Sequence, residues 1–122
     1  MDEAERIFVV DDDGSVRKAV RRLLVSAGYD VEEFASAVDF LAAVPPTTPG
    51  VLVLDVRMPD LGGLELQRRL RRESSPLKVI LVTAFPQPGE SEQGLREGAI
   101  GFLVKPFESS ALLDLVERAR SA

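Results

Sequence analysis

Residues 51–63 have the sequence VLVLDVRMPDLGG, in which a short apolar run is followed at once by an aspartate. The run Val51–Leu54 shows no polar alternation, which is typical of a strand buried on both faces of a parallel sheet. Pro59 and the glycines at 62 and 63 indicate a loop, and the leucines at 64, 66 and 70 indicate a helix. A buried strand followed by a loop and a helix is the repeating unit of an α/β fold.

The same unit recurs on both sides of this stretch. The predicted strands are Arg6–Val10, Tyr29–Phe34, Val51–Leu54, Val79–Val82 and Ile100–Val104, and the predicted helices are Ser15–Ala27, Ser36–Val44, Gly63–Glu73, Glu90–Glu97 and Ser109–Arg120. This alternation predicts a doubly wound, five-stranded parallel sheet with helices on both faces. The helix over 90–97 is a poor one by propensity, since its only large apolar residue is Leu95.

Composition narrows the possible functions. The 122 residues are enough for one domain, and the 15 basic and 20 acidic residues give a net charge of −5, which argues against direct nucleic-acid contact. The absence of Cys and His excludes thiolate nucleophiles, zinc–thiolate sites and histidine-based triads. The longest apolar runs are too short to span a membrane, and the acidic N-terminus lacks a signal-peptide core, so we expect a cytoplasmic protein.

Polar residues stand directly after four of the five predicted strands. Asp11, Asp12 and Asp13 follow the first strand, and the residues after the third, fourth and fifth strands are Asp55, Thr83 and Lys105. Because the carboxyl ends of parallel strands share one edge of the sheet, these side chains must converge. A simpler interpretation is that each residue merely caps a strand or a helix, and Asp13 or Ser15 is expected to cap the first helix.

The chemistry of the converging set is coherent. Carboxylates without His or Cys form a hard-oxygen site that suits Mg²⁺. A hydroxyl and an ammonium group on the other side of the site suit the oxygens of a phosphoryl group. The edge therefore predicts a Mg²⁺-assisted phosphoryl site with a carboxylate as possible nucleophile.

Four segments in this chain resemble the response-regulator receiver domain. They are VDDD at 10–13, LDVRMPDLGG at 54–63, VTA at 82–84 and KPF at 105–107, and residues 51–70 are similar to the FixJ branch of transcriptional regulators. The resemblance implies the CheY-like fold with strand order 2-1-3-4-5. It also implies a phosphorylation-activated receiver of a two-component system, not a conventional enzyme, over residues 1–122, with no output domain in this stretch.

The resemblance assigns roles to individual residues. It implies that Asp55 accepts the phosphoryl group, and that Asp12, Asp55 and the backbone carbonyl of Arg57 bind Mg²⁺, for which Mn²⁺ can substitute. Asp11 is expected to hold metal-bound water.

Two further residues are expected to bind the phosphoryl oxygens, namely Thr83 through its hydroxyl and Lys105 through its ammonium group. The Lys105–Pro106 peptide bond is expected to be cis, which proline permits.

The resemblance further implies a sensor histidine kinase as phosphoryl donor and a transcriptional output domain as the target of control. Thr83, the 84–98 segment and Phe102 are expected to form a switch that changes the surface over 84–104. Self-association is expected through the face of the fourth helix, fifth strand and fifth helix. Phe102 stands where an aromatic hydroxyl is common. Arg57 and Phe85 are expected to flank the phosphoryl group and to slow its hydrolysis.

An alternative reading starts from the first loop. FVVDDDGSV at 8–16 also resembles the signature of haloacid-dehalogenase-like phosphatases, with Asp11 as nucleophile and Asp13 as acid–base partner. This alternative leaves Asp55 and the segment after it unexplained. The arginines of the third helix are interpreted as a solvated face. For the basic residues of the first helix the resemblance implies docking of a histidine kinase, with a solvated face as the simpler interpretation.

Overall fold

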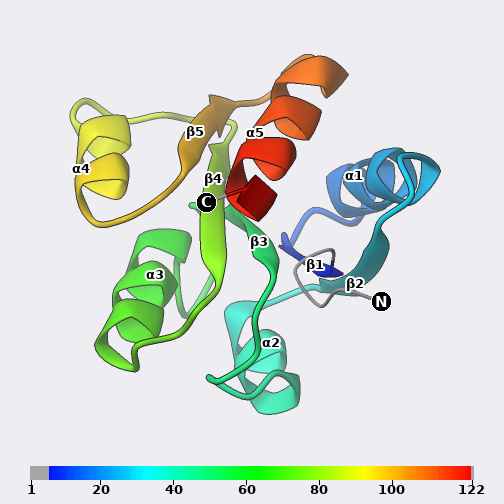
Figure 1. The fold of residues 1–122 in the computed structure, drawn as a ribbon. Coiled ribbons are helices and arrows are strands. Elements are labelled where there is room, and N and C mark those ends of the chain that lie inside the picture. The colour runs from blue at the N-terminus through cyan, green and yellow to red at the C-terminus, as the bar shows by residue number, and fades with distance from the viewer. Residues whose placement is uncertain (1–5, 122) are drawn as a thin grey trace.

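The computed structural model describes residues 6–121 and contains five strands alternating with five helices (Figure 1). The strands are β1 (Arg6–Val10), β2 (Asp30–Phe34), β3 (Val51–Asp55), β4 (Lys78–Thr83) and β5 (Gly101–Val104), and the helices are α1 (Gly14–Ser26), α2 (Ala37–Ala43), α3 (Gly63–Arg72), α4 (Glu90–Arg96) and α5 (Ser109–Ser121). The predicted absence of a signal peptide and the predicted domain limits at residues 1 and 122 fall outside the described residues.

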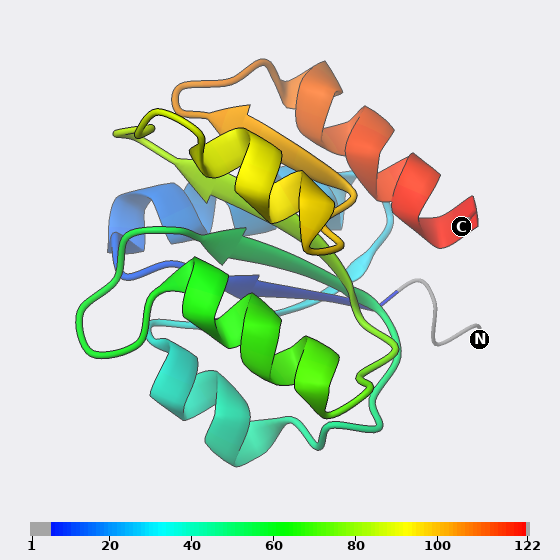
Figure 2. The same cartoon turned by 90° about the vertical axis from the view of Figure 1, so that its left-hand side faces the viewer.

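The strands form one parallel sheet in the order β2-β1-β3-β4-β5, which confirms the predicted topology. All strand arrowheads point to the same edge of the sheet, on the left in Figure 2. The register aligns Val10 with Leu54, Asp55 with Val82, and Thr83 with Val104. The residues at the carboxyl ends of β1, β3, β4 and β5 therefore meet at this edge.

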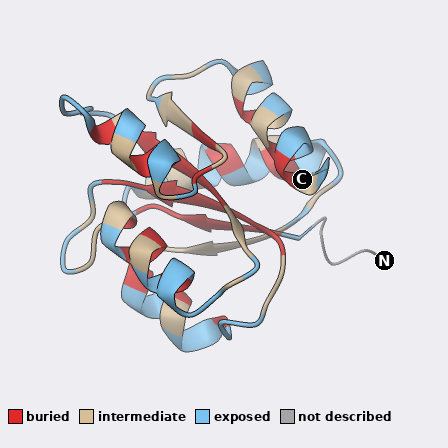
Figure 3. Cartoon of the chain, turned by 60° about the vertical axis from the view of Figure 1, so that its left-hand side comes forward, coloured by how far each residue is buried: buried red, intermediate tan, exposed pale blue. Residues whose placement is uncertain are grey.

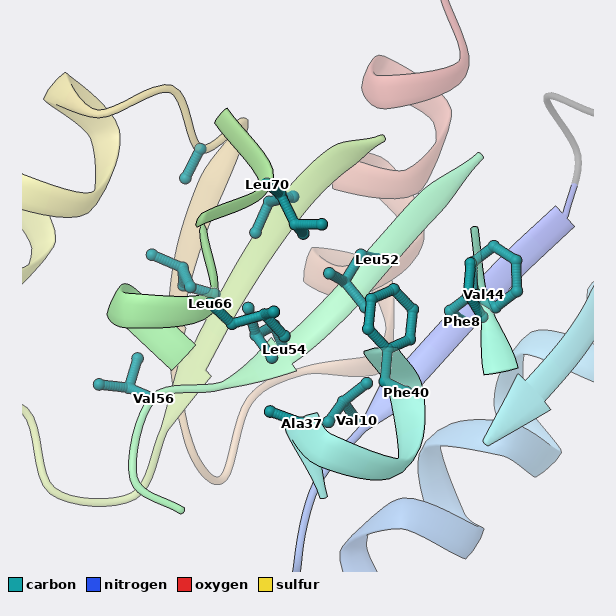
Figure 4. Packing of buried hydrophobic residues seen from close by; sticks show 13 residues of the cluster. Phe8, Val10, Ala37, Phe40, Val44, Leu52, Leu54, Val56, Leu66 and Leu70 are labelled. Atoms are coloured by element: carbon teal, nitrogen blue, oxygen red, sulfur yellow. The ribbon is translucent and has the colours of Figure 1, made fainter. Parts of the chain in front are cut away.

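Helices cover both faces of the sheet, as buried parallel strands require. Helices α1 and α5 pack against one face through residues such as Leu24 and Val116, and α2 and α3 pack against the other through Phe40 and Leu66 (Figures 1 and 4). Every residue of β3 is buried, whereas β2, at the sheet's edge, is only partly covered (Figure 3).

Local signals explain where the helices begin. The Asp13 side chain accepts hydrogen bonds from the backbone N–H groups of Ser15 and Val16, which fixes the start of α1 and confirms one of the two predicted caps. Ser36 caps α2 in the same way by accepting from Asp39 N–H. The observed ends differ from the predicted ones by one residue in most elements.

Helix α4 is attached to the domain differently from the others. The only buried residues in α4 are Glu90 and Gly94, so no aliphatic side chain anchors the helix. A Cβ at Gly94 would lie 2.5 Å from Leu81 Cδ1, which shows that α4 approaches the sheet through this glycine. On its outer side Leu95 is half exposed. The weak amphipathic pattern of the sequence thus has a direct structural counterpart.

Candidate functional site

Three carboxylates meet at the carboxyl edge of the sheet. Asp11, Asp12 and Asp55 each offer an oxygen atom, and these atoms lie within 4.8 Å of one another. Asp11 and Asp55 are almost fully buried, at 2% and 4% exposure, whereas Asp12 is exposed. The pairing of Val10 with Leu54 in adjacent strands positions the first two residues beyond β1 beside the last residue of β3. This confirms the predicted convergence for Asp11, Asp12 and Asp55, whereas Asp13 caps α1 instead.

Lys105 is the cation of this cluster. Its Nζ donates to Asp11 Oδ2 at 2.7 Å and lies 3.5 Å from Asp55 Oδ1. The other oxygen of Asp11, Oδ1, accepts the backbone N–H of Asp13 at 3.0 Å. Lys105 N–H donates to the Thr83 carbonyl at 2.8 Å, and the Lys105–Pro106 peptide bond is cis, as expected. One ammonium group thus contacts two of the three carboxylates, those of Asp11 and Asp55.

The excess of negative charge changes the acidity of the site. Burial raises the pKa of Asp55 to about 7; the negative charge of Asp11 acts in the same direction, Lys105 opposes it, and Asp12 adds to the increase. For Lys105, burial alone would lower the pKa, but the hydrogen bond and negative charge of Asp11 outweigh burial and raise it. Asp55 is therefore held in a site that disfavours its ionised form unless more positive charge is present.

This donor set suits a hard divalent cation. All three groups are carboxylates, their oxygens are close enough to share one ion, and they carry more negative charge than Lys105 balances. The exposed position of Asp12 leaves the site open to solvent on that side. The cluster is thus an acidic triad of the kind that binds Mg²⁺.

Thr83 is the last residue of β4, and Phe102 lies on the neighbouring strand β5. Thr83 has no exposed surface, and its Oγ1 accepts the backbone N–H of Phe85 at 3.2 Å. Phe102, on β5, is partly buried and packs against the core on the α2–α3 face of the sheet. The Thr83 hydroxyl therefore already has a partner in the loop that it was expected to move.

Arg57 contacts both Phe85 and the start of α4. The Arg57 guanidinium forms an ion pair with Glu90 and donates to the Phe85 carbonyl at 3.4 Å. The Phe85 side chain is 72% exposed. In this structure, Arg57 links the β3–α3 loop to the start of α4. Whether these two residues prolong a phosphorylated state stays a prediction.

Two supporting features hold the acidic residues in place. A Cβ at Gly63 would lie 2.3 Å from the Asp55 carbonyl oxygen, so only glycine allows α3 to start this close to β3. Asp60, with φ of 70°, provides the left-handed residue of the intervening turn.

On the other side, Arg17 donates to the Asp11 carbonyl and to Glu33 Oε1, both at 2.8 Å. The Arg17 side chain is thus tied to the acidic loop and to β2, and kinase docking by the first helix stays a prediction.

Comparison with known proteins identifies the family. The sequence model of the protein family described as 'Response regulator receiver domain' matches residues 7–117. The chain belongs to this family. This receiver domain is 39% identical over 113 residues to the transcriptional regulatory protein FixJ of Bradyrhizobium diazoefficiens, a match that covers 93% of the chain and 55% of FixJ.

Solved structures agree with the sequence comparison. The structure of the response regulator StyR superimposes with a TM-score of 0.88 at 45% identity, covering 95% of this receiver domain and 59% of StyR. The beryllofluoride-activated receiver dimer of NtrC4 gives a TM-score of 0.88 at 26% identity, covering 96% of this chain and 97% of that one. The chain spans about half the length of the first curated relatives that it matches.

The family membership decides between the readings of the first loop. This chain is a receiver domain of the type found in two-component transcriptional regulators, not a conventional enzyme. The phosphatase alternative, with Asp11 as nucleophile, is wrong, because the receiver-domain family matches residues 7–117, a range that includes Asp55 and the segment after it. Among residues 6–121, no helix has both the length and the apolar character of a membrane span.

Proposed function

We propose that Asp55 accepts a phosphoryl group from a sensor histidine kinase, and that its phosphorylation changes the surface over residues 84–104. The observation that carries this proposal is the buried position of Asp55 within the acidic triad and beside Lys105. In the transfer, an Asp55 oxygen forms a bond to phosphorus while the bond from phosphorus to the kinase histidine nitrogen breaks. The nitrogen keeps that electron pair, so no further reactant is needed.

Each neighbouring group has a defined task in this proposal. Asp11, Asp12, Asp55 and the Arg57 carbonyl would hold Mg²⁺ or Mn²⁺, with Asp11 acting through metal-bound water. When bound, the ion supplies positive charge that offsets the carboxylates and the incoming phosphoryl oxygens. Lys105 would pair with one phosphoryl oxygen from its position between Asp11 and Asp55.

Thr83 would serve as the hydroxyl that detects the phosphoryl group. To reach it, the Thr83 hydroxyl must turn away from its present contact with Phe85 N–H. This rotation would loosen the β4–α4 loop and open space for the Phe102 ring. Lys105 and Thr83 must act together, because converting a 1% active population to 99% takes about 5.5 kcal/mol, more than one hydrogen bond provides.

The test is an intact-mass measurement after incubation with acetyl phosphate. We expect the mass of one added phosphoryl group with Mg²⁺, no addition with EDTA, and no addition to the Asp55→Asn variant. The matched control is Asp30→Asn, which removes an exposed carboxylate elsewhere. Retention of the Mg²⁺-dependent gain by Asp55→Asn would refute the assignment of the acceptor.

We also propose that the phosphorylated domain self-associates through the α4–β5–α5 face. Leu95 and Val104 on this face are 47% and 45% exposed. The activated NtrC4 receiver, which has the same fold, is described as a dimer. In the whole protein this change would control a transcriptional output domain in the cytoplasm, as in FixJ-like regulators. Sedimentation that finds the same monomer with and without beryllofluoride would contradict the proposed association.

A further inference from the structure

The side chain of Arg57 connects the acceptor strand to α4. Arg57 stands two residues after Asp55, and its Nη2 group binds Glu90 Oε2 and also the Phe85 carbonyl. Glu90 is the first residue of α4 and is only 8% exposed. The Arg57 guanidinium, next to the proposed phosphorylation site, is thus paired with the buried Glu90 carboxylate of α4, the helix that is expected to move.

Glu90 also organises the loop that precedes α4. Its second oxygen, Oε1, accepts the backbone N–H of Gln87 at 3.0 Å. Because α4 has no buried aliphatic side chain, this carboxylate is a main attachment of its first turn. The far end of the helix is fixed separately, by hydrogen bonds from Gln67 and Arg68 to Glu97 and from Gln67 to the Gly94 carbonyl.

We propose that Glu90 is a positioning residue of the phosphorylation site that acts through Arg57. In the unphosphorylated domain, Glu90 holds the Arg57 guanidinium at the start of α4. A phosphoryl group on Asp55 competes for this guanidinium. The inference rests on the proposed function of Asp55.

Charge favours the exchange. A phosphorylated side chain carries a charge of about −1.5 to −2, against −1 for a carboxylate, and its oxygens suit the planar fork of arginine. Once Arg57 turns to the phosphoryl group, Glu90 is left buried with only the Gln87 N–H as partner. A buried carboxylate without its cation is unfavourable, so Glu90 and the first turn of α4 move toward water. The charge at Asp55 is thereby converted into displacement of α4.

This route converges with that of Thr83 at a single residue. The Phe85 carbonyl accepts from Arg57, and the Phe85 N–H donates to Thr83 Oγ1. Both contacts are lost when Arg57 and Thr83 turn to the phosphoryl oxygens. One event at Asp55 therefore releases the β4–α4 loop on both sides of Phe85.

The experiment measures the affinity of the Mg²⁺-bound domain for beryllofluoride, which mimics the phosphoryl group, by NMR titration. Glu90→Gln keeps an oxygen for Gln87 N–H but removes the charge that competes for Arg57. We expect Glu90→Gln to bind beryllofluoride about tenfold more tightly than the unsubstituted domain. The matched control is Glu92→Gln, on the same helix turn but exposed, for which we expect no change.

A double-mutant cycle separates this mechanism from a general loosening of α4. In an Arg57→Met background, Glu90→Gln should no longer change beryllofluoride affinity. An unchanged or weaker affinity in Glu90→Gln, or an equal gain in the Arg57→Met background, overturns the inference. If Glu90→Gln does not fold, Glu90→Asp takes its place, because it keeps the charge but shortens the reach to Arg57. We expect Glu90→Asp to bind beryllofluoride more tightly than the unsubstituted domain, by less than Glu90→Gln would. An unchanged affinity in Glu90→Asp overturns the inference. Failure of the unsubstituted domain to bind beryllofluoride would instead overturn the proposed role of Asp55.

Discussion

Replacing Asp55 by asparagine should stabilise the fold at neutral and alkaline pH while abolishing phosphorylation. Burial and the neighbouring carboxylates raise the pKa of Asp55 from an ordinary 3.8 to about 7. At about 1.4 kcal/mol per pKa unit, ionising this group in the folded protein costs about 4 kcal/mol. Because the cluster is open to solvent at Asp12, we reduce this to about 2 kcal/mol.

The direction of the pH dependence follows from the two pKa values. Below pH 4, Asp55 is protonated in both the folded and the unfolded chain and does not affect their balance. Between pH 4 and 7 the folded state binds more protons than the unfolded state, so stability falls as the pH rises. Asparagine cannot ionise and avoids this loss. The advantage of Asp55→Asn should therefore grow from near zero at pH 4 to about 2 kcal/mol at pH 8.

Urea denaturation followed by circular dichroism tests this, with EDTA present, at several pH values from 4 to 8. Adding Mg²⁺ at pH 8 should stabilise the unsubstituted domain more than the variant, since the ion binds the folded triad. The difference in free energy of unfolding between the two proteins should therefore become smaller. Asp30→Asn serves as the exposed control and should show no such trend. If the stability advantage of Asp55→Asn over the unsubstituted domain does not increase between pH 4 and 8, the reasoning about repulsion in the triad is refuted.

Three further substitutions probe the surroundings of the site. Lys105→Met removes the ammonium group that contacts Asp11 and Asp55 and should destabilise the fold by about 2 kcal/mol at pH 8, with a smaller loss at pH 4, in the same denaturation assay. Gly63→Ala places a Cβ 2.3 Å from a backbone oxygen and should cost about 2 kcal/mol or more, whereas Gly14→Ala, whose Cβ would meet nothing closer than 3.6 Å, should be neutral or stabilising. Arg17→Met should lower the free energy of unfolding by about 1.5 kcal/mol and weaken Mg²⁺ binding, measured by calorimetry, several-fold. Arg22→Met, an exposed control, should change neither the stability nor the Mg²⁺ affinity.

The topology was predictable because the strands carry a strong signal. An uninterrupted apolar run such as Val51–Leu54 can only be buried on both faces, and the parallel sheet follows from the helices between such runs. The exact ends were not predictable, because they depend on pairing. Lys78 joins β4 through its pairing with Val51, although a charged residue gives no strand signal. The backbone N–H of Ile100 donates to the Val79 carbonyl although β5 begins one residue later, at Gly101. The start of β5 therefore depends on a single hydrogen bond.

The site was predictable as far as strand ends position it. Asp11, Asp55, Thr83 and Lys105 were found because each is the first polar residue after a buried strand. The roles of Arg17 and Glu90 were not found, because both lie on helices. A helical pattern shows which face is polar but not which polar side chain a neighbouring loop covers. Only the packing of the β3–α3 loop against α4 reveals that Glu90 is buried and paired with Arg57.

The polar attachment of α4 would let this helix move in the proposed switch while it stays ordered in the unphosphorylated domain. A helix held by buried leucines cannot shift without exposing apolar surface, at about 25 cal/mol for every Å². Helix α4 is held instead by polar contacts of Glu90, Glu97 and the Gly94 carbonyl, together with close packing at a glycine. Polar contacts can be exchanged for water or for a phosphoryl group at little net cost. Under the proposed function, the poor helix-forming sequence over 90–97 would serve signalling, because it weakens the element whose position the charge at Asp55 would change.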